Sequence, residues 1–209
     1  MAGIKHLKEV QIKKGNDFLD NILNHYVVIN ENINGTFFGV KKDKEDSFTF
    51  FKKAGQITYV DQMLMKFYNQ AINYFNTLSS EKIKRIPSNF YFGFQYITNK
   101  DGAHSKYDRK PKNNLVLSYI HKLDDNGKIE STVQSKDQLE RWAYYLEVEP
   151  PPIIFEGKLD DDQKTSLLEF VHTPFEELTE KFKTTSFTKY IVSVLNTELN
   201  ASFLKNKVL

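Results

Sequence analysis

The stretch VVINENINGTFFGVKKDKEDSFTFFKKAG, residues 27–55, decides how this chain is expected to fold. A β-branched run at residues 27–29 is followed by a break at Gly35. Two aromatic-rich runs, residues 37–41 and 48–53, then flank a charged segment at residues 42–46. Because β-branched and aromatic residues favour strands and Gly and Asp favour turns, the stretch predicts strand, tight turn, strand, hairpin loop and strand.

The first turn carries ENINGT, residues 31–36, and this segment resembles the first motif of the RNA-ligase and covalent nucleotidyltransferase superfamily. That motif usually reads Glu-Lys-x-Asp/His-Gly-Thr/Ser before an aromatic strand. FKKAG, residues 51–55, resembles the next motif of the superfamily, at a similar spacing. The resemblance implies a nucleotide-binding site that includes Glu31, Asn32, Asn34, Gly35 and Lys53.

Asn32 departs from the motif at the position that matters most for chemistry. In the superfamily a lysine amine attacks the α-phosphate of ATP there and forms a lysyl-AMP intermediate. The amide nitrogen of Asn32 is delocalised into its carbonyl, and covalent catalysis needs a group that can be activated as a nucleophile. Asn34 likewise replaces the usual acidic residue or His. We therefore expect a chain that keeps the scaffold and has lost the chemistry, with no catalytic residue; an engineered Lys-to-Asn change at position 32 is another explanation.

FYFGFQYI, residues 90–97, predicts a strand with a bulge at Gly93 and resembles the third motif, Tyr/Phe-Gly-x-Glu-Tyr/Phe. Gln95 stands where that motif has a glutamate near the ribose, and it can hydrogen-bond without carrying a charge. Residues 115–121 predict a buried strand similar to the one that lines the adenine pocket. The resemblance extends over about residues 18–195.

The loop over residues 98–114 is basic. It contains Lys106, Arg109, Lys110 and Lys112, with Tyr107 between them. Such a loop is a candidate for binding RNA or phosphate, since phosphate contacts come mainly from Lys and Arg. The competing interpretation is an ordinary polar loop.

Active relatives also carry Glu-Gly-x-Val and Lys-x-Lys motifs. Glu156-Gly157 and Lys181-x-Lys183 are local matches, but Lys158 breaks the first pattern and a helix is expected directly after it. Lys181 and Lys183 fall near a helix end, where cations favour the helix dipole. We therefore expect the sequence to stop before both motifs begin.

The whole pattern predicts an α+β protein, with antiparallel β-sheets flanked by helices, a nucleotidyltransferase-like arrangement and a helical C-terminal part over residues 160–209. We expect one domain over residues 1–209, with a basic arm at residues 1–15. Helical patterns predict helices at five places, three of them with an Asn or Asp cap, and residues 187–195 fit a helix or a strand. The helices are expected at residues 16–26, 61–78, 135–146, 160–171 and 174–182, with a polar connector at 79–87 and a hairpin turn at 124–127.

Composition narrows the class of protein. The 209 residues include no cysteine, so neither disulfides nor a thiolate metal site can form, and no metal site is expected. The formal charge of +2 gives no global basic field. No apolar run is long enough to span a bilayer, so no membrane partner is expected and a cytoplasmic protein is predicted. The high Lys, Asn, Ile and Phe content suggests an AT-rich genome such as that of a phage, which would place the protein in the host cytoplasm.

Three functions fit the sequence. The first is a degenerate nucleotidyltransferase, a pseudoenzyme that binds ATP or AMP, RNA or a protein partner. The second is an active RNA ligase or adenylyltransferase that works with Mg²⁺ and takes its nucleophile from Lys41, Lys42, Lys53 or a partner chain. The third is a phage structural or host-interaction protein that reuses the fold.

Overall fold

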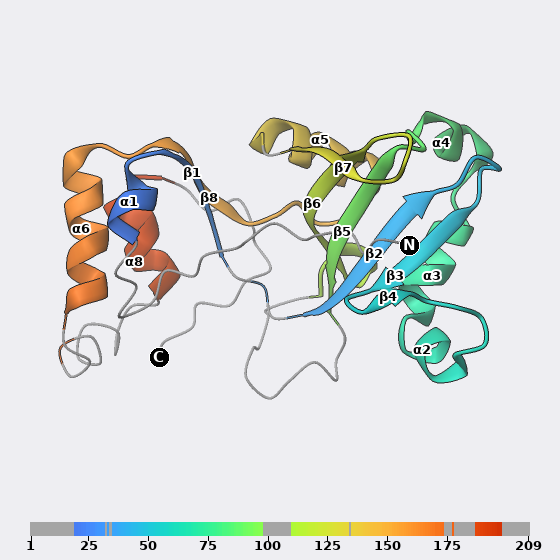
Figure 1. Ribbon diagram of the computed structural model, residues 1–209. Coiled ribbons are helices and arrows are strands. Elements are labelled where there is room, and N and C mark those ends of the chain that lie inside the picture. The colour runs from blue at the N-terminus through green and yellow to red at the C-terminus, as the bar shows by residue number, and fades with distance from the viewer. Residues whose placement is uncertain are drawn as a thin grey trace. The chain divides into compact units, whose positions relative to one another are not determined.

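The computed structural model divides the chain into two compact units (Figure 1). Unit 1 comprises Met1–His6 and Ile33–Pro151, and unit 2 comprises Leu7–Asn32 and Pro152–Leu209. The single-domain prediction stays a prediction. The structure describes residues 19–31, 33, 35–97, 110–133, 135–173, 177 and 187–197.

Unit 1 is built on a six-stranded antiparallel sheet in the order β4-β3-β2-β5-β6-β7. The strands predicted within residues 27–55 and at residues 90–97 and 115–121 all form. Charged turns join β2 to β3 and β6 to β7, as expected. A register shift lies next to Gly93, where a bulge was predicted, but the extra residue is Ser118 in the partner strand β6 rather than a residue of β5. The strands are β2 (Thr36–Lys42), β3 (Phe48–Lys52), β4 (Gly55–Gln56), β5 (Phe90–Tyr96), β6 (Leu115–Leu123) and β7 (Ile129–Val133).

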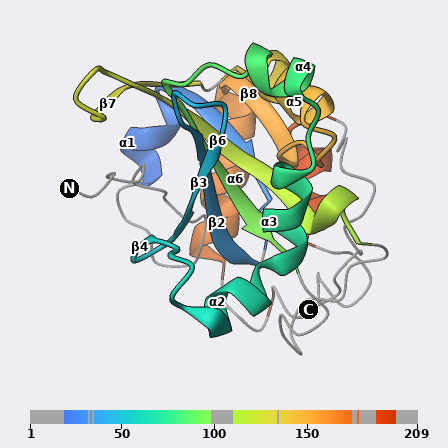
Figure 2. The same ribbon diagram turned by 90° about the vertical axis from the view of Figure 1, so that its right-hand side faces the viewer.

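The helices of unit 1 cover one face of this sheet and bury an aromatic core. They are α2 (Gln62–Phe67), α3 (Asn69–Asn76), α4 (Ser80–Arg85) and α5 (Lys136–Tyr145), and Figure 2 shows the first three on the same side of the sheet. Phe38 of β2 lies at the centre, with its ring centroid 5.7 Å from that of Phe50 and 5.4 Å from that of Tyr68. Trp142 of α5 packs edge-on against Phe92, on the same face.

Two sequence predictions in this region are wrong. Residues 61–78 form two helices rather than one, because the chain leaves helical geometry at Tyr68 (φ −90°, ψ 10°). The Tyr68 hydroxyl donates to the carbonyl of Phe37, 3.1 Å away, which fixes this residue to the sheet. The supposed connector at residues 79–87 contains α4, whose first turn is capped by the Ser79 hydroxyl.

Unit 2 contains a two-stranded antiparallel sheet of β1 (Tyr26–Asn30) and β8 (Ile153–Lys158). The helices described in full are α1 (Leu19–Leu23), α6 (Asp161–His172) and α8 (Phe187–Val194), so the last of them shows the segment at residues 187–195 to be a helix rather than a strand. The predicted helix over residues 16–26 ends early, since Tyr26 already belongs to β1. The arm at residues 1–15 lies outside the described residues, as does the predicted helix at 174–182 apart from residue 177. The core consists of Leu23, Ile29, Ile154, Leu159, Leu167, Ile191 and Leu195.

The fold class is therefore α+β, with antiparallel sheets flanked by helices, as the sequence predicted.

Candidate functional site

Two of the predicted site residues, Gly35 and Gln95, adjoin at one end of the six-stranded sheet. Thr36, the first residue of β2, pairs with Tyr96 of β5. A Cβ atom on Gly35 would lie 3.2 Å from the Cβ of Gln95 and 3.0 Å from the carbonyl oxygen of Tyr96. The backbone at Gly35 therefore approaches β5 so closely that a side chain at this position would have to push the neighbouring atoms of β5 aside.

Three of the predicted cations lie at the same end of the sheet. Lys53 is exposed and follows β3 directly, at the end where β2 begins, because Phe51 pairs with Gly39. Lys110 and Lys112 are exposed and precede β6. Lys112 begins a 3₁₀ turn, η1 (Lys112–Asn114), and its backbone N–H donates to Glu149 Oε1, 3.2 Å away. This end of the sheet, which we call the sheet end, therefore combines Gly35, Lys53, Gln95, Lys110 and Lys112.

The remaining predicted residues are not assigned to the sheet end. Asn32, Asn34, Lys106, Arg109 and Lys183 lie outside the described residues. Glu31 belongs to unit 2, where its backbone N–H donates to the carbonyl of Pro152, 3.0 Å away.

Glu156 also belongs to unit 2 and lies in β8, whose last residue is Lys158, two residues before the N-cap of α6. It accepts a hydrogen bond of 2.9 Å from the Tyr26 hydroxyl, and this bond raises the pKa of Tyr26. The strand thus leads into a helix, as the sequence predicted.

The face of the sheet opposite the described helices of unit 1 carries stacked rings, of which Tyr91 and His121 are buried. We call it the aromatic face and define it by Phe37, Phe51, Tyr91, Tyr119 and His121. The rings of Phe37 and Tyr119 stack at 6.4 Å with 12° between their planes, and Tyr119 lies 4.4 Å from His121. Tyr91 lies between Phe51 and His121, 5.3 Å and 6.2 Å from them.

Two glycines let these rings lie against the strands. A Cβ on Gly39 would meet the Tyr91 hydroxyl at 2.2 Å, and one on Gly93 would meet the Tyr119 ring at 2.3 Å. Real Cβ atoms do not approach other atoms so closely, so a side chain at either position would force the neighbouring tyrosine to shift. Burial raises the pKa of Tyr91, which stays a neutral phenol. Phe37 and Tyr119 remain partly exposed, and flat rings of this kind are suited to stacking on a planar ligand.

Two of the three lysines considered as an alternative nucleophile lie at the end of β2 that is far from Gly35. Lys41 and Lys42 are the last two residues of that strand, whereas Gly35 precedes its first residue. Six residue steps along a strand span roughly 20 Å. Lys42 is also 8% exposed, and its ammonium pairs with Asp46 at 2.8 Å.

A second candidate site, which the sequence did not predict, is a groove of about 500 Å³ on the helix-covered side of unit 1. We call it the tyrosine groove. Its residues come from three separate segments, at α3, α4 and the end of α5, and no single motif marks them. The lining residues are Tyr74, Thr77, Leu78, Ser79, Glu81, Lys82, Arg85, Tyr145 and Glu147.

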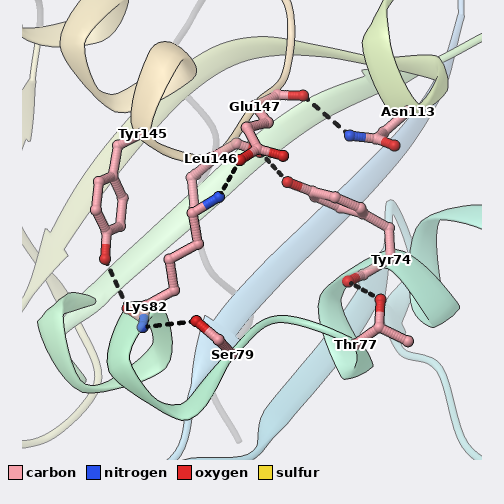
Figure 3. Close-up of polar contacts among 8 residues, drawn as sticks. All are labelled: Tyr74, Thr77, Ser79, Lys82, Asn113, Tyr145, Leu146 and Glu147. Carbon is pink, nitrogen blue, oxygen red and sulfur yellow. Dashed lines mark hydrogen bonds and ion pairs between the residues drawn. The ribbon is translucent and has the colours of Figure 1, made fainter.

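Hydrogen bonds fix the walls of the tyrosine groove (Figure 3). The Tyr145 hydroxyl donates to the Lys82 carbonyl at 2.8 Å, and the Tyr74 hydroxyl donates to the carbonyl of Leu146. The Lys82 ammonium pairs with Glu147. Burial, and secondly the charge of Glu147, raise the pKa of Tyr74 to about 12.

No protein-family model matches this chain, and no curated protein sequence matches it either. Among the described residues, no group of three or more His, Cys, Asp or Glu side chains is placed to hold a metal ion. The helices in the described part of the chain are too short or too polar to cross a membrane.

Proposed function

We propose that this protein is a degenerate, nucleotidyltransferase-like protein that binds ATP or AMP without forming a lysyl-AMP intermediate. The observation that carries the proposal is the sheet end. Two positions of motif-like sequence that lie sixty residues apart, Gly35 and Gln95, adjoin there, with a 3.2 Å approach at the Cβ positions. A nucleotidyltransferase-like version of the α+β fold is part of the same proposal.

The sheet end and the aromatic face offer the kinds of contact that a nucleotide needs. Phe37 and Tyr119 present partly exposed rings for stacking on a base. The Gln95 amide is suited to a hydrogen bond with a ribose hydroxyl. Lys53, Lys110 and Lys112 supply positive charge for phosphates and are exposed.

The residues at and near the proposed site also argue against transfer of the nucleotide to the protein. Asn32 has no nucleophilic amine, and Lys41 and Lys42 lie roughly 20 Å along the strand from the sheet end. Lys53 is the one remaining candidate among the three, and its place in the basic motif suits contact with phosphate. A pocket without the nucleophilic lysine is also better served by the neutral Gln95 than by a carboxylate, which would repel the phosphates of ATP.

Calorimetric titration with ATP and AMP tests the binding. We expect saturable binding that is weakened by Gln95→Ala and by Lys53→Gln, each removing one contact. Lys44→Gln is the matched control, because Lys44 is exposed in the loop between β2 and β3, away from the sheet end. Absence of binding to either nucleotide in the wild-type protein would refute the proposal.

Incubation with ATP labelled at the α-phosphate and Mg²⁺, followed by a denaturing gel, tests the inactivity. We expect no labelled protein band. A stable band would instead favour the alternative, an active RNA ligase or adenylyltransferase, and mapping the labelled lysine would identify its nucleophile. Absence of nucleotide binding together with absence of a labelled band would leave a structural or host-interaction role.

A further inference from the structure

The η1 turn at the sheet end is supported by a buried carboxylate. Glu149 is 6% exposed, and its Oε1 accepts the hydrogen bond from the backbone N–H of Lys112. Its own backbone is fixed to β6 on both sides, since its N–H donates to the carbonyl of Leu115 at 3.1 Å and its carbonyl accepts from the N–H of Leu117 at 2.9 Å. Burying a carboxylate is costly unless hydrogen bonds compensate, so the contact with η1 stabilises both partners.

The same turn is tied to two further parts of unit 1. The side-chain amide of Asn113 donates to the carbonyl of Glu147 at 2.9 Å, which joins η1 to the segment after α5 (Figure 3). The carbonyl of Asn114 accepts from the N–H of Ile97 at 2.8 Å. Ile97 directly follows β5, the strand that contributes Gln95 to the sheet end. The turn is therefore fixed relative to both α5 and β5.

This junction concentrates unusual backbone conformations. Asn113, Asn114 and Glu147 have φ angles of 53°, 60° and 50°, in the left-handed region that side chains rarely adopt. They are three of the five non-glycine residues with positive φ in the described part of the chain. Such conformations persist where the surrounding contacts impose them, and they cluster at ligand-binding sites. The contacts around η1 therefore help to impose its conformation.

Two exposed lysines flank the buried part of this turn. Pro111 is buried, whereas Lys110 and Lys112 on either side of it are exposed. A carboxylate beside these cations does not help an anion to bind, because like charges repel. Glu149 is better explained by geometry, because by accepting from the N–H of Lys112 it holds the backbone from which both lysines extend.

We propose that Glu149 is a positioning residue of the sheet end, which holds η1 so that Lys110 and Lys112 contact the same polyphosphate chain. The inference rests on the proposed function, because it takes phosphate to be the group that the sheet end binds. Glu149 itself does not contact the ligand. Its effect on binding passes through the backbone of η1.

Two variants separate positioning from charge. Glu149→Ala removes both the charge and the acceptor, whereas Glu149→Gln removes the charge and keeps an oxygen that accepts from the N–H of Lys112. Loss of a nearby negative charge alone would make both variants bind anions more tightly than wild type. Loss of positioning should instead weaken binding in Glu149→Ala by roughly tenfold, the usual effect of losing one hydrogen bond to a charged group, while Glu149→Gln binds at least as tightly as wild type.

Calorimetric titration with inorganic tripolyphosphate is the primary measurement, because this probe has neither base nor ribose and reports on the phosphate contacts alone. Titration with ATP follows under the same conditions. Glu45→Ala is the matched control, since it removes an exposed carboxylate from the loop between β2 and β3, away from the sheet end, and should bind as wild type. Hydrogen exchange of the Lys112 amide, followed by NMR, should be faster in Glu149→Ala than in wild type or in Glu149→Gln.

The inference is overturned if Glu149→Ala binds tripolyphosphate as tightly as wild type or more tightly, or if Glu149→Gln loses as much affinity as Glu149→Ala. If circular dichroism shows that Glu149→Ala does not fold, Asn113→Gly takes its place, because glycine tolerates the left-handed backbone and only the bond to Glu147 is lost. Asn113→Gly should bind tripolyphosphate roughly 2- to 10-fold more weakly, and wild-type affinity in this variant would overturn the inference.

The same titrations distinguish a failure of this inference from a failure of the proposed function. ATP binding that Glu149→Ala leaves unchanged would refute the positioning role and keep the nucleotide site. Tripolyphosphate binding with the expected dependence on Glu149, without binding of ATP or AMP, would refute nucleotide binding and keep the positioning role. Wild-type protein that binds none of the three probes would overturn both.

Discussion

Gly93 determines whether the aromatic face can form, because the Tyr119 ring lies directly against its backbone. A Cβ at this position would meet three atoms of that ring, the nearest at 2.3 Å. Overpacking of this kind usually costs about 1–3 kcal/mol. We expect Gly93→Ala to lower the free energy of unfolding by about this amount, measured by urea denaturation.

The clash with Tyr119 can be separated from the effect of alanine on the backbone by a double-mutant cycle. Tyr119→Ala removes the ring, so Gly93→Ala should cost much less in that background. Equal costs in the two backgrounds would mean that the glycine is required for another reason.

Tyr74 makes stability depend on pH in the alkaline range. Its folded-state pKa of about 12 lies above the ordinary value of 10.0, so the folded protein holds this proton more tightly than the unfolded chain does. The resulting stabilisation is complete below pH 10 and is lost as the pH rises from 10 to 12. We expect Tyr74→Phe to lower the unfolding free energy at neutral pH by about 1 kcal/mol, since the carbonyl of Leu146 loses its donor.

The same variant should also show a smaller fall in melting temperature between pH 10 and pH 12 than wild type. Thermal denaturation monitored by circular dichroism at a series of pH values measures both effects. Tyr59→Phe is the matched control, because Tyr59 is 77% exposed, and it should leave the neutral-pH stability unchanged. A Tyr74→Phe profile that follows wild type over this range would contradict the assignment.

The α6 helix begins with a complete capping box. Asp160 Oδ1 accepts from the backbone N–H of Gln163 at 2.8 Å, and the Gln163 side chain accepts from the Asp160 N–H at 3.1 Å. Loss of such a cap typically costs about 1 kcal/mol. We expect Asp160→Ala to lower the unfolding free energy by this amount in chemical denaturation. Asp162→Ala, which removes a carboxylate from the same first turn without removing the cap, should cost clearly less.

Elements were predictable where their pattern was local. Aromatic-rich runs predicted β2, β3 and β5, and an aspartate cap followed by helically spaced apolar residues predicted α6. The division between α2 and α3 was not predictable, because it depends on the hydrogen bond from Tyr68 to Phe37, thirty-one residues away. The α4 helix was missed because its six residues have no buried apolar side chain, so no periodic apolar face appears in the sequence.

The candidate sites were likewise predictable only where a local sequence pattern marks them. Motif-like segments predicted that Gly35 and Gln95 belong to one site, and the pairing of β2 with β5 brings them together. The tyrosine groove could not be predicted, because Tyr74, Lys82 and Tyr145 meet only after α3, α4 and α5 have packed. The proposal of binding without catalysis depends on Asn32, which lies outside the described residues, and is argued from the chemistry of its side-chain amide.

At the scale of the whole molecule, the two units can be tested separately because each has its own core. The single tryptophan, Trp142, lies in unit 1, so its fluorescence reports on that unit. Leu167 is fully buried in the core of unit 2. Leu167→Ala should cost about 2–5 kcal/mol, since it removes a transfer contribution and leaves a cavity.

If the units unfold independently, Leu167→Ala should lower the midpoint of an early transition seen by calorimetry and far-ultraviolet circular dichroism and leave the tryptophan midpoint in place. Leu117→Ala is the matched variant, because Leu117 is equally buried but lies in β6 of unit 1. It should move the tryptophan midpoint and leave the other transition. Should Leu167→Ala shift both signals together, the units would form one cooperative domain, because loss of packing in one core would then destabilise the other by the same free energy.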